Sequence, residues 1–399
     1  MPQLADRMST LQPSAIIRMA QKAADLKASG QKIASLSIGV PGFTPPEYVY
    51  EAALKAVKAD SGEYLPGRGS KGLLEAFIKT QAAKGFIYGM AEVCAQPGGK
   101  GALFNLLLAL VNPGDRVLIP APYWASYPEM AKLVGGVPVT PYAGPENNYK
   151  LTAEQLSAQL GDDVTVLIFN SPSNPTGMVY SRAELEGIAA VLRKHPDLWI
   201  ISDDIYDHLI FSGEQRATHL LDVAPDLKDR LIIVQSISKT YGMPGWRVGL
   251  VAGPKPVVSA LVDMASQSFT NLPAVPMAAA EAALNGPLDF LAPQLGRLQK
   301  HRDLTLAALK KLGLECPTPQ GAFYVFPNIK NALGKTSAGG AVIKTDEDFC
   351  TALLAEQQVA AVPGGAFGDK HAIRLSYAGK EPDLLAGLEG LTKFVTSLK

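Results

Sequence analysis

One lysine, Lys239, has neighbours whose types suit covalent chemistry with a phosphorylated aldehyde. It ends the run Ser236-Ile237-Ser238-Lys239 behind an apolar stretch, and Arg247 follows eight residues later. A lysine amine forms a Schiff base with an aldehyde, while serine hydroxyls and a guanidinium donate hydrogen bonds to phosphate oxygens. The grouping therefore predicts a cofactor that carries both an aldehyde and a phosphate.

An acid and a phenol follow an apolar strand-like run 36 residues before this lysine, at Asp203 and Tyr206. A carboxylate keeps a pyridine nitrogen protonated, and a phenol can hydrogen-bond a ring oxygen. By itself, an acidic pair after a strand is more often a helix cap or a surface turn. Its position ahead of Lys239 favours the functional interpretation.

Two turn-rich segments could supply further donors. Asn174 lies in Asn-Ser-Pro-Ser-Asn-Pro-Thr-Gly (170–177), whose composition is also that of a rigid loop. Gly99 and Lys100 precede an apolar helical stretch, where free backbone amides at a helix N-terminus favour a phosphate. The spacing does not match a Walker loop, so a nucleotide is disfavoured.

Arg374 is a charge inside the apolar, strand-like run 373–377. Burying an unpaired guanidinium is costly, so it needs either a salt bridge to another side chain or a carboxylate from a substrate. The residue alone does not separate these two explanations. Trp124 is likewise open, because it could pack in the core or stack on a planar cofactor.

Composition excludes several classes of protein. The 399-residue chain has 37 basic and 37 acidic residues, so it has no overall basic field for nucleic acid or an anionic membrane. Its three cysteines lack metal-ligand or redox spacing, and its five histidines show no metal-site pattern. No apolar stretch is long enough for a membrane span. We therefore expect a cytoplasmic protein with no metal, nucleic-acid or membrane partner.

Short β-branched runs alternate with helical patterns, which is typical of an α/β protein with a parallel sheet covered on both faces. The expected strands are residues 116–120, 164–169, 198–202, 231–235 and 248–252. A helix should begin near Pro45, and an amphipathic helix should end the chain. We predict an N-terminal arm and part of a small domain (1–46), a large cofactor-binding domain (47–290) and a small C-terminal α+β domain (291–399).

With these residues identified, the chain resembles the class I pyridoxal-phosphate-dependent aminotransferases of fold type I, and most closely the bacterial aspartate aminotransferase branch. The resemblance covers nearly the whole chain and implies a mostly parallel seven-stranded sheet sandwiched by helices, with a smaller α+β domain. The matching motifs occur in family order: Tyr64, Gly99 to Ala102, Tyr123-Trp124, Asn170 to Gly177, Asp203 to Tyr206, Ser236 to Lys239, Arg247 and Arg374.

The resemblance implies roles for the residues around the cofactor ring. Lys239 would hold the cofactor as a Schiff base and move the proton between the substrate α-carbon and the cofactor. Asp203 would pair with the pyridine nitrogen, Tyr206 and Asn174 with the ring oxygen, and Trp124 would stack on the ring.

The family pattern also implies phosphate and substrate contacts. The phosphate would be held by Ser236, Ser238, Arg247, Gly99 and Lys100, together with Tyr64 from a second subunit. The substrate carboxylate would be held by Arg374, Asn174, Trp124 and Gly39. Because the family builds each site from two chains, the resemblance implies a homodimer.

Substrate choice depends on fewer residues. Lys100 matches a lysine that meets the side-chain carboxylate in this branch, and Ser14 and Ser266 match supporting polar positions. Ile16 replaces a usual threonine, and Gln12 replaces a lysine often found in relatives that accept prephenate. The segment 39–43, Gly-Val-Pro-Gly-Phe, departs from the common Gly-Glu-Pro-Asp-Phe. We expect ping-pong transamination of L-aspartate or L-glutamate with 2-oxoglutarate or oxaloacetate.

Three other activities fit parts of the pattern. Aromatic or other neutral amino acids form a second class of donor, and a carbon-sulfur lyase would use a similar lysine and carboxylate clamp. A transcription regulator built on the same fold would need a basic DNA-binding domain before the cofactor domain. The cofactor domain begins almost at the N-terminus, so we expect no such domain.

Overall fold

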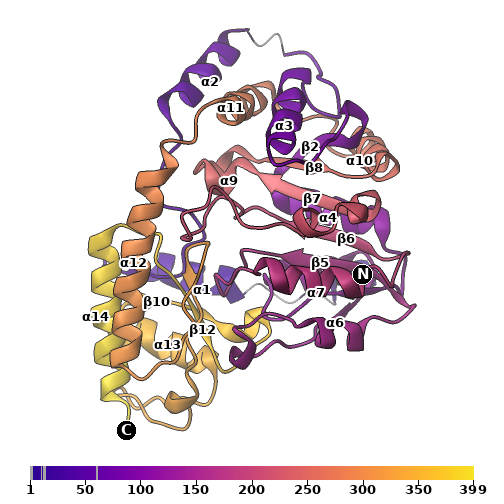
Figure 1. Ribbon diagram of the computed structural model, residues 1–399. Helices are drawn as coiled ribbons and strands as arrows, with labels where there is room; N and C mark the ends of the chain where they lie inside the picture. Colours follow the sequence, from indigo (N-terminus) through magenta and orange to yellow (C-terminus); the bar gives the residue numbers. More distant parts are fainter. Residues whose placement is uncertain (1–2, 10, 12–14, 60–61) are drawn as a thin grey trace.

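Seven strands form the central sheet of this α/β protein, in the order β2-β8-β7-β6-β5-β3-β4 (Figure 1). The computed structural model describes residues 3–9, 11, 15–59 and 62–399. The strands of this sheet are β2 (Val93–Pro97), β3 (Arg116–Leu118), β4 (Val137–Val139), β5 (Val164–Asn170), β6 (Trp199–Asp203), β7 (Leu231–Ser236) and β8 (Val248–Ala252).

The central strands run parallel from β4 through β3, β5 and β6 to β7, while β8 is antiparallel to both its neighbours, β7 and β2. Successive side chains of a strand point to opposite faces. Leu231 and Ile233 of β7 therefore belong to the hydrophobic cluster on one face, and Ile232 and Val234 to the cluster on the other. Burial on both faces explains why these strands are continuous apolar runs.

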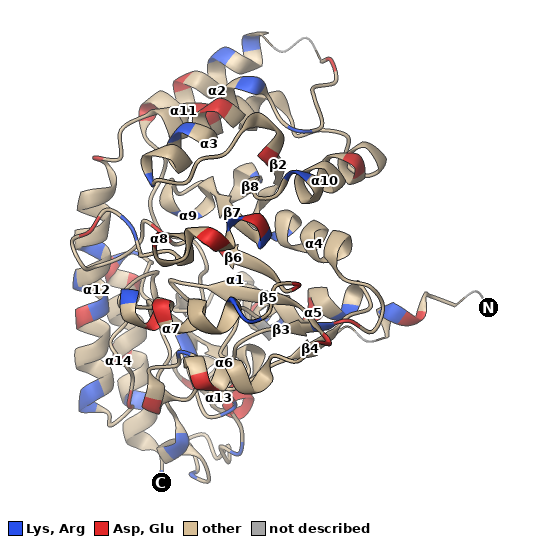
Figure 2. Cartoon of the chain, turned by 45° about the vertical axis from the view of Figure 1, so that its right-hand side comes forward, with Lys and Arg blue, Asp and Glu red and all other residues tan. Residues whose placement is uncertain are grey.

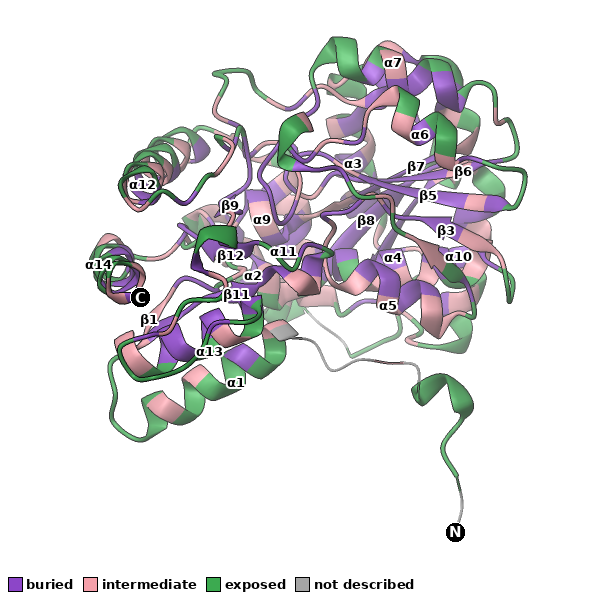
Figure 3. Ribbon diagram, turned by 90° about the horizontal axis from the view of Figure 1, so that it is seen from below, coloured by how far each residue is buried: buried purple, intermediate pink, exposed green. Residues whose placement is uncertain are grey.

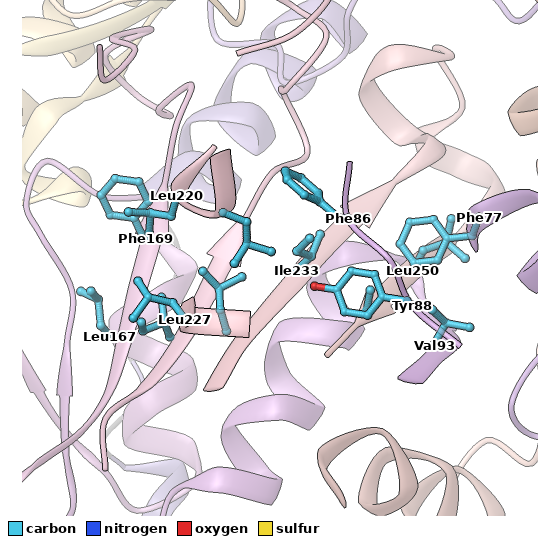
Figure 4. Packing of buried hydrophobic residues seen from close by; sticks show 14 of the residues in the cluster. Phe77, Phe86, Tyr88, Val93, Leu167, Phe169, Leu220, Leu227, Ile233 and Leu250 are labelled. Atoms are coloured by element: carbon cyan, nitrogen blue, oxygen red, sulfur yellow. The ribbon is translucent and has the colours of Figure 1, made fainter. Parts of the chain in front are cut away.

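Helices cover both faces of the sheet. One face packs against α4 (Gly98–Leu110), α5 (Ser126–Leu133) and α10 (Lys255–Gln267). The other face carries α2 (Glu47–Ala59), α3 (Lys71–Ala83), α6 (Ala153–Gln159), α7 (Arg182–Leu192), α8 (Leu220–Val223) and α11 (Ala274–Asn285). Figure 4 shows part of the hydrophobic cluster between the sheet and these helices, in which Phe77 and Phe86 lie near Leu250 and Ile233.

A separate hydrophobic cluster, away from the central sheet, contains residues from both ends of the chain. In it, β1 (Ala34–Ser35) pairs with β10 (Val359–Ala360), and β11 (Val362–Pro363), β12 (Ile373–Ser376) and β9 (Tyr324–Val325) form a three-stranded sheet. The surrounding helices are α1 (Ala15–Ala28), α12 (Leu291–Lys311), α13 (Asp346–Gln357) and α14 (Glu381–Ser397). Figure 3 shows the strands buried between helices whose outer faces are exposed.

The structure confirms the expected α/β class, and the predicted strands agree with it to within two residues at each end. The strand predicted to reach Pro120 ends at Leu118, and the helix predicted to begin near Pro45 begins at Glu47. The pairing of β1 with β10 places the first part of the chain beside the last. It accords with the proposed domain division, whose boundaries stay a prediction.

Charged residues of both signs are interspersed over the surface in Figure 2, as the balanced composition predicts. In the part of the chain that the structure describes, no helix is both long and apolar enough to cross a membrane.

Candidate active site

A cavity of about 190 Å³ lies where the carboxyl ends of β5, β6 and β7 meet the strands β9 and β12. In open α/β sheets this edge is the usual place for a ligand. The cavity brings together residues that the sequence scatters over 335 positions, from Gly39 to Arg374. The predicted site residues that line it are Gly39, Trp124, Asn174, Asp203, Tyr206, Lys239 and Arg374.

Asp203 is the last residue of β6 and is 1% exposed. The Tyr127 hydroxyl donates a hydrogen bond to its carboxylate at 2.5 Å. Burial raises the pKa of Asp203 to about 7, with the charge of Asp204 adding to the rise and the Tyr127 hydrogen bond opposing it. A carboxylate in this setting gains strongly from a nearby cation. The protonated nitrogen of a pyridine ring would be such a cation.

Lys239 lies in the short helix α9 (Ile237–Thr240), which begins directly after β7. Its ammonium donates a hydrogen bond to the Gly39 carbonyl oxygen at 2.6 Å and lies within 6 Å of the ring centres of Tyr206 and Phe323. Burial and the neighbouring Arg374 charge lower the pKa of Lys239 to about 8. Near neutral pH a larger fraction of this amine is therefore unprotonated and nucleophilic than in an ordinary lysine.

Arg374 lies in β12 and is 2% exposed. Its guanidinium donates to the Asn174 side-chain oxygen at 3.0 Å and to the Ser37 carbonyl oxygen at 3.1 Å, while Nε has no partner among the described atoms. Within the described residues no carboxylate forms an ion pair with it, so the salt-bridge explanation is not supported. A buried guanidinium with a free N–H favours an external carboxylate.

Beside the cavity, the predicted phosphate-binding residues converge. The Ser236 and Ser238 hydroxyl oxygens are 2.6 Å apart, and Arg247 donates to the Pro97 carbonyl oxygen at 3.2 Å. Gly98 begins α4 with φ +75°, and a Cβ there would collide with the Arg247 guanidinium. The positive φ favours glycine at this position, where the guanidinium crosses the N-terminus of α4. Hydroxyls, a guanidinium and a helix N-terminus together suit a phosphate.

Lys100, in the first turn of α4, holds its ammonium 4.9 Å from the centre of the Trp124 ring. Its side chain reaches solvent, yet partial desolvation lowers its pKa and the Arg247 charge lowers it further. Among the described residues Lys100 forms no ion pair with an acid. Because Trp124 lines the cavity, the Lys100 ammonium lies at the cavity's edge, as a second cation besides Arg374.

Two of the predicted residues that the structure describes, Tyr64 and Ser266, do not lie at the cavity of this chain. Tyr64 is 87% exposed, and the Ser266 hydroxyl, on the exposed side of α10, donates to the Asp263 carbonyl oxygen at 2.6 Å. Ser14, like Gln12, lies outside the described residues. For Tyr64 the sequence predicts a role in a second subunit, and its exposure leaves that prediction open.

Sequence reasoning missed residues that contact the predicted ones, chiefly Tyr127 and Tyr324. The Tyr324 hydroxyl lies 3.1 Å from that of Tyr206, and both tyrosines line the cavity. Asn170 also lines it, and its amide donates to the Asp203 carbonyl oxygen at 2.8 Å. The sequence had indicated Asn170 only as the first residue of the motif 170–177. The sequence around the two tyrosines shows no motif, and a tyrosine without one is interpreted as an ordinary packing residue.

The fold and the cavity together define an enzyme of the pyridoxal-phosphate-dependent, fold type I class. The residues present fit that cofactor on three structural grounds. Lys239 is a half-buried amine with a lowered pKa, Asp203 is a buried acid that forms no ion pair with a cation among the described residues, and the α4 N-terminus lies beside Arg247 and Ser236. Each group matches one part of the cofactor: aldehyde, pyridine nitrogen and phosphate.

Comparison with known proteins supports the same class. Residues 31–390 match the family described as aminotransferase class I and II. The chain is 43% identical over 397 residues to the aspartate/prephenate aminotransferase of Cereibacter sphaeroides, with 99% of each chain covered. Its fold matches the crystal structure of the Rhizobium meliloti aspartate aminotransferase with a TM-score of 0.96, at 36% identity and full coverage of both chains.

A further solved structure, the aspartate aminotransferase of Thermus thermophilus with maleate, matches with a TM-score of 0.91 at 34% identity. That match covers 98% of this chain and 100% of the other. The chain belongs to the class I and II aminotransferase family.

The lowered pKa of Lys239 predicts how the apoenzyme captures its cofactor. Only the neutral amine attacks an aldehyde, so the rate of reaction with added pyridoxal phosphate should rise nearly tenfold per pH unit below a pH of about 8 and then level off. An ordinary lysine would give a rise that continues to about pH 10. Stopped-flow absorbance between pH 6 and 10 measures this rate, and a rise past about pH 9.5 would contradict the lowered pKa.

Proposed function

We propose that this enzyme transfers the amino group of L-aspartate or L-glutamate to 2-oxoglutarate or oxaloacetate by a ping-pong mechanism. The observation that carries the proposal is that one cavity combines the Lys239 amine with Arg374, a buried guanidinium that lacks a carboxylate partner among the described residues. Lys100 adds a second cation at the cavity's edge, as a substrate with two carboxylates requires. The names of the relatives support the same substrates.

When bound, pyridoxal phosphate supplies an electron sink for the electron pair released at the substrate α-carbon. Asp203 would hold a proton on the ring nitrogen, and Tyr206 and Asn174 would hydrogen-bond the ring oxygen. Lys239 would hold the cofactor through Nζ and would serve as the general acid/base for the proton of the substrate α-carbon. Asp203, Tyr206 and Asn174 are buried and Lys239 is half-buried, which limits the access of water to that proton.

The other residues orient the reactants. Arg374 and Asn174 would bind the α-carboxylate next to Gly39, and Trp124 would stack on the cofactor ring. The phosphate would be held by Ser236, Ser238, Arg247 and the N-terminal amides of α4 at Gly99 and Lys100. The ammonium of Lys100 meets the side-chain carboxylate of the substrate.

A spectrum tests this proposal before any assay of turnover. The holoenzyme should show a visible cofactor band that shifts when L-aspartate alone is added, because the first half of a ping-pong reaction needs no acceptor. Removing aspartate and adding 2-oxoglutarate should restore the band. The proposal fails if the band is absent, or if aspartate changes it no more in wild type than in Lys239→Ala.

Replacing Lys100 with alanine should separate acidic from neutral substrates. Loss of a charged hydrogen bond costs about 1.5–3 kcal/mol, so KM for L-aspartate should rise about 10- to 100-fold. KM for a neutral donor such as L-phenylalanine should change less than about twofold, because such a donor has no second carboxylate. Steady-state kinetics with both donors measures the two effects.

Lys71→Ala is a matched control, because Lys71 is an exposed lysine at the start of helix α3, on the opposite face of the sheet from α4, and does not line the cavity. It should leave both KM values unchanged. If Lys100→Ala raised KM equally for aspartate and phenylalanine, Lys100 would not select the substrate and its role would be limited to cofactor binding.

Prephenate, as an acceptor, is a second candidate substrate, because the Cereibacter sphaeroides relative is named for aspartate and prephenate. The identity of residue 12 argued against it, and that residue lies outside the described part of the chain. A panel with prephenate, neutral and aromatic donors, and cystathionine distinguishes the alternatives. Release of ammonia and pyruvate from cystathionine would instead indicate the lyase.

We infer a homodimer in which Tyr64 completes the partner's phosphate site, because an aromatic residue that is 87% exposed in one chain gains from burial in a second. Sedimentation velocity tests the dimer, and weaker cofactor binding in Tyr64→Phe tests the shared site. We place the enzyme in the cytoplasm, since its cysteines are all free in the structure and show no pairing pattern. Cell fractionation would test the location.

A further inference from the structure

Tyr324 touches two of the groups that the proposed mechanism needs, although the sequence gives no sign of a role for it. It lies in β9 directly opposite Ser376 of β12. Arg374 lies two residues before Ser376, so its side chain points to the same face of the strand. This register brings the centre of the Tyr324 ring to 4.5 Å from the Arg374 guanidinium carbon.

The hydroxyl of Tyr324 reaches the other group. It lies 3.1 Å from the Tyr206 hydroxyl, which is its hydrogen-bond partner among the described residues. A Cβ added at Gly39 would be 3.6 Å from the same hydroxyl. The phenol therefore ends beside Gly39, whose carbonyl oxygen accepts the hydrogen bond from Lys239.

Packing leaves Tyr324 little freedom to move. The side chain is 1% exposed, and its ring lies 4.5 Å from the ring centre of Phe323 and 6.1 Å from that of Tyr206, nearly perpendicular to the latter. A side chain held on several sides keeps one orientation. Its ring and its hydroxyl are thus both fixed relative to the cavity.

Counting protons sets the direction of the hydrogen bond between the two tyrosines. Burial raises the pKa of both phenols, so both keep their protons at neutral pH. A hydroxyl donates one hydrogen bond and can accept two. If Tyr206 donates to the cofactor's ring oxygen, the bond between the tyrosines has to be donated by Tyr324.

We propose that Tyr324 is a positioning residue: its hydroxyl donates to Tyr206 and strengthens the bond that Tyr206 donates to the cofactor, while its ring supports Arg374 at the substrate carboxylate. The inference rests on the proposed function, because it assigns Tyr206 to the ring oxygen and Arg374 to the carboxylate. Hydrogen bonds in a chain polarise one another, so a donor behind Tyr206 makes Tyr206 a better donor.

Two substitutions separate the hydroxyl from the ring. Tyr324→Phe keeps the ring and removes the donor, which should raise the pH midpoint of the visible cofactor band by about half a unit to one unit. The midpoint rises because a weaker bond from Tyr206 stabilises the deprotonated chromophore less. The dissociation constant of maleate, a dicarboxylate that has no amino group to transfer, should stay within about twofold of wild type.

Tyr324→Leu removes the ring as well, so maleate should dissociate about 3- to 30-fold more readily, as expected for loss of a cation–π contact. KM for aspartate and for a neutral amino acid should rise together, because the α-carboxylate is common to both. Tyr377→Phe is the matched control: Tyr377 is a fully buried tyrosine of the same hydrophobic cluster that does not line the cavity. It should shift neither the band nor maleate binding.

Spectral titration of the holoenzymes, with circular dichroism to confirm folding, decides the outcome. A midpoint in Tyr324→Phe equal to that of wild type overturns the role of the hydroxyl, and equal maleate affinities in the Phe and Leu variants overturn the role of the ring. If wild type itself shows no band shift with aspartate, the proposed function fails instead. A wild-type shift with unchanged Tyr324 variants rejects this inference alone.

Discussion

Replacing Lys239 with alanine is expected to lower the turnover of L-aspartate by at least about 10⁴-fold, because one side chain serves as both covalent anchor and general acid/base. In the structure, the half-buried Lys239 side chain lines the cavity, and its pKa of about 8 lets the amine both accept and release a proton near neutral pH. Within the described residues, no other lysine lines that cavity. Single-turnover absorbance with aspartate measures the loss.

Lys239→Arg sharpens this test. Arginine keeps a positive charge but does not release a proton in this pH range, so the variant should be as inactive as Lys239→Ala. Lys255→Ala, which removes an exposed lysine at the start of α10, should retain full activity. Activity above a tenth of wild type in either Lys239 variant would show that another group moves the proton.

The central strands could be predicted because each is buried on both faces, so its sequence is an almost continuous apolar run. Residues 164–169 and 231–235 are such runs, and they became β5 and β7. The edge strands β2 and β4 were missed because their sequences lack such a run. In β4, Val-Pro-Val is too short to show a pattern, and β2 contains a glutamine and ends in proline. Only the pairing of β2 with β8 makes it a strand.

The candidate site was predictable where a residue type is unusual for its surroundings. Arg374 in an apolar strand and Asp203 at the end of another stand out in the sequence, because burying a charge has to be compensated. Tyr127 and Tyr324 do not stand out, since a buried aromatic residue is ordinary. Their contacts with Asp203 and Tyr206 depend on helix placement and strand register, which spacing along the chain does not encode.

Asp203→Asn is expected to have opposite effects on the enzyme with and without its cofactor. With the cofactor bound, an amide cannot keep the ring nitrogen protonated, so transamination should fall about 10³- to 10⁴-fold and the cofactor should bind more weakly. Without it, the buried carboxylate forms no ion pair within the described part of the chain, and burial holds its pKa at about 7. The ionised side chain then destabilises the apoenzyme.

Proton binding by Asp203 determines how the stability of the apoenzyme changes with pH. The folded apoenzyme holds the Asp203 proton more tightly than the unfolded chain, whose carboxyl has a pKa near 3.8. The contribution of Asp203 to the free energy of unfolding is therefore fully present below about pH 4 and is lost as the pH rises through about 7. The total loss is up to about 4 kcal/mol. The amide introduced by Asp203→Asn does not ionise. The variant apoenzyme should therefore unfold at a temperature several degrees higher than wild type at about pH 8, and at nearly the same temperature at about pH 4.

Thermal unfolding of apoenzyme and holoenzyme at the two pH values tests this prediction. Asp369→Asn provides a matched control, because Asp369 is also buried and also accepts a tyrosine hydrogen bond, from Tyr142 at 2.8 Å, but lies outside the cavity. Adding pyridoxal phosphate should stabilise wild type more than Asp203→Asn, because only the carboxylate gains a cationic partner. If the Asn variant gains as much from the cofactor as wild type does, Asp203 does not face the ring nitrogen.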